Sequence, residues 1–228
     1  MKLIAHRGAS LLCRENTIES LLTAVAYGAD AVECDLSFRT KDGKFIVFHD
    51  PDLKRIADDP TMIFEATYEQ ISDILWEKAG YRPIILEDLI AKYDADTPVL
   101  LDIGLPAEPE LIAMIRTIPF PFILGVSRPQ DVCIWRKAFP NHPMLGFVPS
   151  PNHIEAFISD GVNMIRLWEQ WLDDITPLDV KAINLDIEVW IMSNRNGCMD
   201  GSAESLSVLE TLGADGVLLN DIALASRR

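Results

Sequence analysis

Short apolar runs alternate along the chain with segments whose apolar residues recur at helical spacing. The first run, Lys2–Ala5, precedes such a segment at Glu15–Ala26, and Gly28 then marks the end of a helix. A second run, Ala31–Ser37, alternates in the manner of a strand. In all we expect eight strands, at Lys2–Ala5, Ala31–Ser37, Val99–Ile103, Phe122–Val126, Met144–Val148, Met164–Trp168, Ile187–Met192 and Gly216–Leu219.

Helical patterns lie between these strands. The clearest are Glu15–Ala26, Glu108–Arg116, Gln130–Phe139, Ile154–Ser159 and Ser202–Leu212. Strands and helices that alternate so regularly are typical of βα units, a parallel sheet and right-handed crossovers. Eight such units predict an α/β protein with a single (β/α)8 TIM barrel over residues 1–228. A doubly wound open sheet is the main alternative, and no linker rich in Gly, Ser or Pro divides the chain.

One stretch departs from this alternation. Phe38–Lys44 joins the second strand to another strand-like run, Phe45–His49, and contains the dipeptide Asp42-Gly43. Asp-Gly between alternating apolar residues is a strong signal for a β-hairpin. We therefore expect a hairpin excursion after the second strand of the barrel, which returns His49 to the neighbourhood of Asp35.

Two segments of the chain resemble each other. Gly28–Val32 near the start is similar to Gly213–Val217 near the end, and each combines a glycine that can end a helix with a polar turn and a buried strand. An internal duplication would explain the likeness. We favour the alternative, a common chemistry of loops that lead from helix to strand.

The acidic composition argues against two classes of partner. The chain has 20 Lys and Arg against 35 Asp and Glu, a formal charge of −15, and a pI of about 4.6. No basic stripe is available to bind a nucleic-acid backbone. An anionic membrane surface would be repelled for the same reason, so neither kind of partner is expected.

The first residues and the cysteines favour a cytoplasmic protein. The apolar run within Met1–Arg7 is too short for a signal peptide and is broken by charge. No window approaches the roughly 18 apolar residues that a membrane helix needs. The four cysteines lie far apart, at Cys13, Cys34, Cys133 and Cys198. This spacing suits neither a zinc knuckle nor a dense disulfide framework, so we expect reduced thiols.

Candidate catalytic groups fall at the carboxyl ends of predicted strands, where the active site of a TIM barrel lies. His6 and Arg7 follow the first strand, Glu33 and Asp35 share one face of the second, and Asp102 lies near the end of the third. Three converging carboxylates predict a site for Mg²⁺ or Ca²⁺ rather than Zn²⁺. Each residue type also has an alternative explanation. The carboxylates could form a solvated acidic face, the histidine could be structural, and Arg7 could form a surface ion pair.

Short motifs in the first fifty residues carry a family resemblance. In order, they are Ile4–Gly8, Glu15–Thr17, Gly28–Asp35, Thr40–Gly43 and His49–Asp50. Their order and spacing resemble those of the glycerophosphodiester phosphodiesterase family. Weaker similarities follow at Arg55, Pro83–Asp88, Val189–Asn194 and Gly213–Asp221.

The resemblance implies a single TIM-barrel domain that hydrolyses glycerophosphodiesters to glycerol 3-phosphate and an alcohol. It also implies a divalent cation, with a small molecule as the partner. By the same resemblance, His6 and His49 are the acid–base pair and Arg7 holds a phosphate oxygen. Trp190 contacts the glycerol or a quaternary ammonium head group, with barrel packing as the alternative. The oligomeric state and the choice between water and the glycerol 2-hydroxyl as nucleophile stay open.

The resemblance further implies Glu33 and Asp35 as metal ligands. The chain departs from the family's pattern at the third ligand. Asp102 stands where the family's Glu-x-Lys motif has its third ligand, and Gly104 stands where it has the lysine. A charged hydrogen bond to phosphate contributes on the order of 1.5–3 kcal/mol, so the lysine is a serious loss. Lys41, Arg166 and Arg128 are other cations that could enter the site.

The departures leave two alternatives to a diesterase. Gly104 favours a catalytically weak or inactive relative that binds a phosphoester, whereas the retention of both histidines argues against it. A phosphodiesterase for lysophospholipids is the second alternative, and the lack of an amphipathic membrane segment weighs against that. The segment Pro51–Arg82, which includes a helical pattern at Tyr68–Trp76, is a compact counterpart of the family's substrate-covering subdomain.

Overall fold

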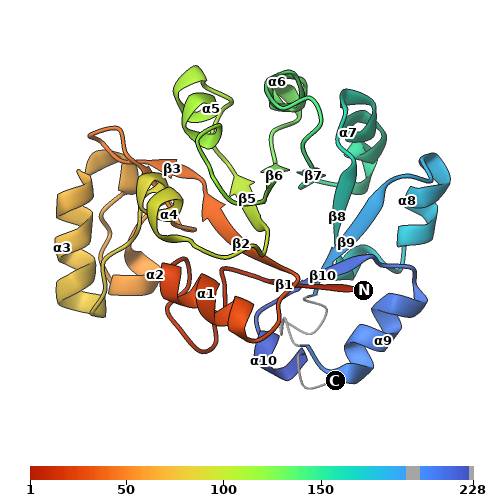
Figure 1. The fold of residues 1–228 in the computed structure, drawn as a ribbon, viewed down its shortest axis with the longest axis horizontal. Coiled ribbons are helices and arrows are strands. Elements are labelled where there is room, and N and C mark those ends of the chain that lie inside the picture. Colours follow the sequence, from red (N-terminus) through yellow and green to blue (C-terminus); the bar gives the residue numbers. More distant parts are fainter. Residues whose placement is uncertain (194–200, 226–228) are drawn as a thin grey trace.

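Eight parallel strands form a closed barrel in the computed structural model, which describes residues 1–193 and 201–225 (Figure 1). The strands are β1 (Lys2–Ala5), β2 (Ala31–Leu36), β5 (Val99–Ile103), β6 (Phe122–Val126), β7 (Met144–Gly146), β8 (Met164–Trp168), β9 (Glu188–Met192) and β10 (Gly216–Leu219). Around the ring they follow the order β1-β10-β9-β8-β7-β6-β5-β2. The predicted TIM barrel is therefore confirmed, and the open sheet is excluded.

Helices surround the ring of strands, as Figure 1 shows for α5 to α9. They are α1 (Ile18–Ala26), α4 (Leu86–Lys92), α5 (Pro109–Ile115), α6 (Val132–Ala138), α7 (Ile154–Asp160), α8 (Pro177–Ile183), α9 (Ala203–Thr211) and α10 (Ile222–Ala225). Short 3-10 turns lie at Ile63–Glu65, Pro129–Asp131, Pro151–His153 and Glu169–Trp171. The sequence pattern did not predict α4, α8 or α10.

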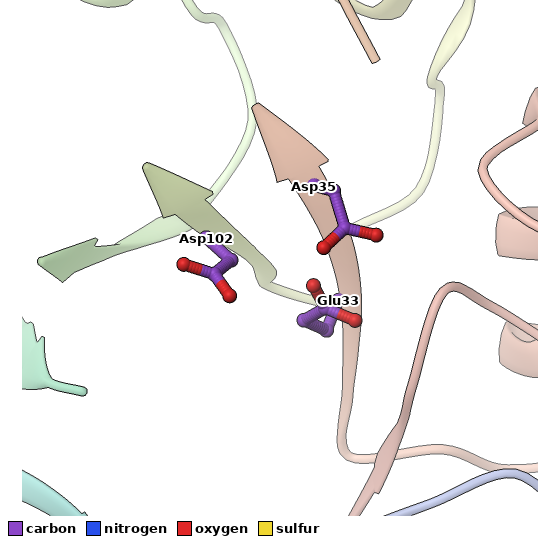
Figure 2. Close-up of side chains that lie close together, drawn as sticks. All are labelled: Glu33, Asp35 and Asp102. Carbon is purple, nitrogen blue, oxygen red and sulfur yellow. The ribbon is translucent and has the colours of Figure 1, made fainter. Parts of the chain in front are cut away.

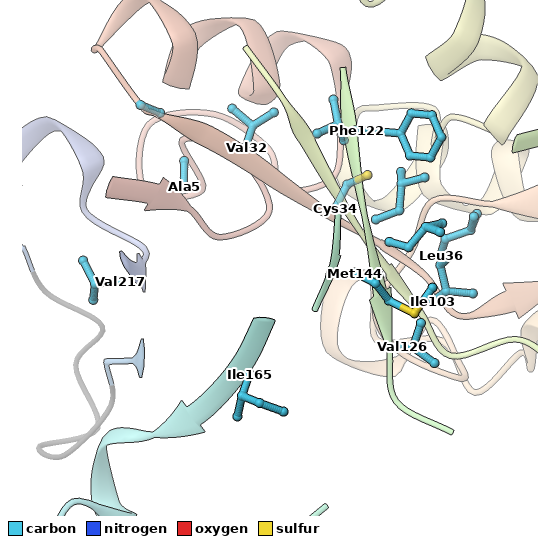
Figure 3. Packing of buried hydrophobic residues seen from close by; sticks show 14 of the residues in the cluster. Ala5, Val32, Cys34, Leu36, Ile103, Phe122, Val126, Met144, Ile165 and Val217 are labelled. Carbon is cyan, nitrogen blue, oxygen red and sulfur yellow. The ribbon is translucent and has the colours of Figure 1, made fainter. Parts of the chain in front are cut away.

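Alternate residues of each strand point out toward the helices or into the barrel. On β2, Val32, Cys34 and Leu36 belong to the core between strands and helices (Figure 3). Ala31 belongs to a second cluster, inside the barrel, together with Ile4. Every residue of β2 is buried. Its two acidic side chains, Glu33 and Asp35, therefore face the barrel interior and are shielded from solvent.

The predicted hairpin follows β2. Its strands, β3 (Phe38–Arg39) and β4 (Phe45–Ile46), pair in antiparallel fashion around a turn in which Gly43 has φ +86°. The chain then returns to the barrel, because the backbone N–H of Phe48 donates to the carbonyl of Asp35 at 3.1 Å. This return brings His49 to the rim of the barrel near Asp35, as the sequence predicted.

The hairpin leads into a small helical segment with its own apolar cluster. It contains α2 (Lys54–Ala57) and α3 (Tyr68–Ala79), where a helix was expected, and these lie at the left of Figure 1. Thr67 caps the start of α3, and Gly80, at φ +73°, ends it. The cluster consists of Ile46, Phe48, Leu53, Ala57, Ile63, Ala66, Ile71 and Leu75.

The two similar segments of the sequence share one loop device. Before β2, Gly28 leaves α1 with φ +81°, and the Asp30 carboxylate accepts a hydrogen bond of 2.8 Å from the backbone N–H of Leu3 in β1. The device recurs at Gly161, Asn163 and Met144, and again at Gly213, Asp215 and Val189. Three copies in different units favour common loop chemistry over a single internal duplication.

Among the described residues, Cys13, Cys34 and Cys133 are free cysteines, and Cys198 lies outside that part of the chain. Over residues 1–193 and 201–225 there is also no helix long and apolar enough to span a membrane.

The loop device predicts a graded effect at Asp30. Asp30→Ala removes the acceptor for the Leu3 N–H and should lower the free energy of unfolding by about 1 kcal/mol. Asp30→Asn should keep most of the stability, because Asn163 performs the same role before β8. Urea denaturation measures both variants, and equal losses for Asn and Ala would contradict the role assigned to the side-chain oxygen.

Candidate active site at the carboxyl ends of the strands

Three carboxylates converge at the rim of the barrel. Glu33 and Asp35 project from β2, and Asp102 projects from the neighbouring strand β5, where it is the register partner of Asp35 (Figure 2). One oxygen from each lies within 4.8 Å of the others. We call these three residues the carboxylate cluster. The adjacency of β2 and β5 brings together the three residues predicted as metal ligands.

The carboxylate cluster is electrostatically unfavourable without a compensating charge. Burial, and then repulsion from Asp35 and Asp102, raises the pKa of Glu33 well above its ordinary value. Burial and Asp35 raise the pKa of Asp102 to about 7, although Arg166 and Arg7 oppose the shift. Glu33 Oε1 is buried and has no hydrogen-bond partner in the described chain. A set of hard oxygen donors with an unpartnered buried oxygen fits a divalent cation.

The loop after β1 holds the cluster in place with backbone and amide groups. The Arg7 backbone N–H donates to Glu33 Oε2 at 2.8 Å. Asn16 Nδ2 donates to Asp35 Oδ2 at 2.7 Å, and the Asp35 N–H donates to Asn16 Oδ1 at 3.1 Å. Both Arg7 (φ 58°) and Asn16 (φ 57°) are left-handed. Such strain is found where the surroundings determine the conformation, often at functional sites.

His6 lies beside the cluster and is largely buried. Its Nδ1 is 2.8 Å from Asn220 Oδ1, and its Nε2 is 3.9 Å from Glu33 Oε2. Since an amide oxygen accepts hydrogen bonds, the neutral ring carries its proton on Nδ1 and leaves Nε2 free. Burial, followed by the charge of Arg7, lowers the pKa of His6 to about 4, so the ring is neutral near pH 7.

His49 follows the hairpin and is more open to solvent, with its side chain 42% exposed. Its Nδ1 is 2.6 Å from Asp50 Oδ1, and the other oxygen of Asp50 accepts from Arg55 Nε, also at 2.6 Å. The charge of His49 contributes to lowering the pKa of His6, so the two rings are within electrostatic reach of each other. The structure thus brings both predicted histidines to the same rim.

Arg7 joins the cluster to the helical segment after the hairpin. Its Nε is 3.2 Å from Asp35 Oδ2, and its Nη1 donates to Glu15 Oε1 at 3.2 Å. Glu15 also accepts two hydrogen bonds from Arg55, of 2.5 and 3.0 Å. Burial alone would raise the pKa of Glu15, but these arginines lower it. The chain of alternating charges fixes the guanidinium of Arg7 against the rim.

Two of these contacts could not be read from the sequence. Glu15 and Arg55 each belong to a motif, but only the fold shows that they bridge the first loop and the helical segment. Asn220, which orients His6, was not singled out either. Its place directly after the last strand, at the carboxyl rim, was the signal available.

The prediction that Trp190 contacts the substrate is not supported. The side chain is fully buried inside the barrel, and its Nε1 donates to Glu188 Oε1 at 2.6 Å. Lys2, at the start of β1, lies 5.9 Å from its ring centroid. Both neighbours occupy the amino ends of their strands, opposite to the carboxylate cluster. Barrel packing, the alternative reading, explains the residue, and Asn194 of the same motif lies outside the described residues.

The three cations considered for the place of the missing lysine have different environments. Lys41 is exposed on the hairpin. Arg128 is paired with Asp131, at 2.8 Å. Arg166 is buried and acts electrostatically on Asp102. A side chain at Gly104 would have to displace Ser37, because a Cβ there would lie 2.7 Å from Ser37 Oγ.

Residues 6–124 match the family model of the glycerophosphoryl diester phosphodiesterase family, which is more than half of the chain. A similar protein, YhdW of Bacillus subtilis (strain 168), is provisionally named a glycerophosphodiester phosphodiesterase. It is 25% identical over 96% of this chain and 93% of its own length. A glycerophosphodiester phosphodiesterase of Caldanaerobacter subterraneus is 38% identical over a shorter part, 31% of this chain and 29% of that protein.

Solved structures with these family names have the same fold. The glycerophosphodiester phosphodiesterase of Thermotoga maritima superposes with a TM-score of 0.79 at 20% identity, covering 100% of this chain and 97% of that one. A phosphodiesterase of Oleispira antarctica, solved in complex with its product sn-glycerol-3-phosphate, gives 0.78 at 19% identity, covering 100% and 96%. At these identities the likeness establishes the barrel.

The position of Trp190 predicts a role in stability. Trp190→Ala should lower the free energy of unfolding by about 3–5 kcal/mol, because it leaves a cavity in the barrel interior. Trp76→Ala is the control: its side chain is 59% exposed, and its loss should change stability by less than about 0.5 kcal/mol. Similar losses for the two variants in urea denaturation would contradict the packing role.

Proposed function

The chain belongs to the glycerophosphoryl diester phosphodiesterase family, and on that basis we propose that it hydrolyses glycerophosphodiesters to glycerol 3-phosphate and an alcohol. The observation that carries the proposal is the carboxylate cluster with His6 and Arg7 directly beside it. The Oleispira antarctica phosphodiesterase, which shares the fold, was solved with sn-glycerol-3-phosphate bound and supports this class of product.

The carboxylate cluster would hold one divalent cation, Mg²⁺ or Ca²⁺. Its three oxygens come from two adjacent strands, so the barrel itself fixes their spacing. When bound, such an ion supplies positive charge to the non-bridging oxygens of a phosphodiester. Asn16 and the Arg7 backbone hold the carboxylates in position by hydrogen bonds to Asp35 and Glu33.

Proton transfer is the task of the two histidines in this proposal. His6 is oriented by Asn220 so that Nε2 is free to accept the proton of the attacking hydroxyl, from water or from the substrate's own glycerol. His49 is oriented by Asp50, which lies against its Nδ1, and would donate a proton to the departing alkoxide. Arg7 would bind a phosphate oxygen through guanidinium N–H groups that Glu15 does not occupy.

The first test is release of glycerol 3-phosphate from glycerophosphocholine and glycerophosphoethanolamine, with Mg²⁺, Ca²⁺ or chelator. The unchanged protein should turn over with a cation and not with chelator. His6→Ala and His49→Ala should each lower kcat by roughly 10²- to 10⁴-fold, the usual contribution of a general acid or base. His153→Ala is the control, because His153 is an exposed residue of the 3-10 turn Pro151–His153 and its ring contacts Ser150.

Other outcomes of this assay would select the alternatives. If no diester is cleaved although glycerol 3-phosphate binds, the chain is a phosphoester-binding relative and the hydrolytic proposal fails. Faster cleavage of lysophosphatidylcholine than of glycerophosphocholine would instead assign a lysophospholipid-type activity.

The cation site has a test that does not depend on turnover. A divalent cation at 100 times its Kd stabilises the folded state by about 2.7 kcal/mol, which should raise Tm by about 5–10 °C for a chain of this size. Glu33→Gln removes a charged ligand and should abolish most of that rise. Glu19→Gln, an exposed position on α1, should retain it; loss of the rise in both variants, or in neither, would count against the cluster as the cation site.

A further inference from the structure

Arg166 occupies an unusual position for an arginine. It projects from β8 into the barrel interior and is only 6% exposed. Two aromatic rings lie against its guanidinium carbon, with centroids at 4.2 Å for Trp168 and 5.2 Å for Phe147. Such rings hold the plane of the guanidinium and leave its N–H edges available.

Those edges have unfilled hydrogen-bonding capacity. Arg166 Nε and Nη1 are both buried, and neither donates a hydrogen bond to any described residue. An arginine with a structural role differs from it in this same protein: the half-buried Arg136 donates to the backbone carbonyls of Gly161, Phe139 and His142. An unpartnered buried cation is costly to the fold, so its retention requires another explanation.

Arg166 also lies toward the carboxyl rim of the barrel, because Trp168, whose ring covers its guanidinium, is the last residue of β8. Its charge acts on Asp102 of the carboxylate cluster, and Asp102 acts on it in return. Arg128 is occupied by Asp131, and the guanidinium of Arg7 is bound by Asp35 and Glu15. Arg166 is therefore a cation in the barrel interior whose Nε and Nη1 donate no hydrogen bond to a carboxylate of the described chain.

We propose that Arg166 is a substrate-binding residue whose guanidinium donates hydrogen bonds to a non-bridging oxygen of the substrate's phosphate. The inference rests on the proposed function for the identity of the ligand, a phosphate ester. It assigns to β8 a second guanidinium contact to the phosphate, beside the one proposed for Arg7 in the loop after β1. Trp168 and Phe147 act as positioning residues for the guanidinium.

The test is the affinity for glycerol 3-phosphate, measured by titration calorimetry on the full chain with saturating Mg²⁺. Arg166→Met should weaken binding about 10- to 150-fold, as expected for loss of a charged hydrogen bond. Arg166→Lys keeps the charge but not the planar fork, and should bind with intermediate affinity. Arg128→Met is the matched control, with unchanged affinity. Glycerol, which lacks the phosphate, should show no difference between Arg166→Met and the unchanged protein.

Thermal unfolding separates this role from a structural one. Because Arg166→Met replaces a buried cation whose Nε and Nη1 lack hydrogen-bond partners, its Tm should equal or exceed that of the unchanged protein. Unchanged affinity for glycerol 3-phosphate in Arg166→Met would overturn the inference, and a lowered Tm with unchanged affinity would assign a structural role instead. If the unchanged protein cleaves no diester but binds glycerol 3-phosphate through Arg166, the hydrolytic proposal fails while this inference stands.

Discussion

Mutual repulsion among three carboxylates, two of them buried and the third half-buried, is the constraint on which the rest of this active site depends. The pairing of β2 with β5 places Asp35 opposite Asp102, and the pleat of β2 places Glu33 on the same face. In a low-dielectric interior these charges cannot all be present without compensation. The groups that line the cluster are accordingly donors and cations. They include backbone N–H groups, the Asn16 amide and two arginines.

That arrangement requires an unusually conformed loop after β1. Arg7 and Asn16 both adopt left-handed backbone angles, each of which costs on the order of 1–3 kcal/mol. Gly8 between them allows close approach to α1, because a Cβ there would lie 2.5 Å from the Ser20 backbone. The loop can hold this geometry because a closed barrel and a capped helix fix both of its ends. These two conformations direct the Arg7 N–H to Glu33 and the Asn16 side-chain amide to Asp35.

The sequence was informative wherever function follows from strand periodicity. Glu33 and Asp35 alternate with apolar neighbours, so their common face was predictable, and Asp42-Gly43 predicted the hairpin. Periodicity does not report depth along the barrel axis, however. Trp190 shares an inward face with Met192, but its ring is directed toward Glu188 at the amino end of β9, so the structure does not support the predicted substrate contact. The Glu15–Arg55 bridge joins residues forty positions apart and depends on tertiary structure.

A closed barrel also explains how the chain can lack a cation at Gly104 without lacking one in the site. Ser37 fills the space beside Gly104, so a side chain directly after β5 would have to displace Ser37. All eight strands converge on one interior, however, and a long side chain from a strand elsewhere in the ring can reach the same ligand. Arg166 on β8 combines that reach with aromatic support and unused donors. A cation from a different position in the sequence can thus reach the same place in the barrel. Motif spacing does not reveal this, and for that reason the sequence alone indicates a site that lacks a cation.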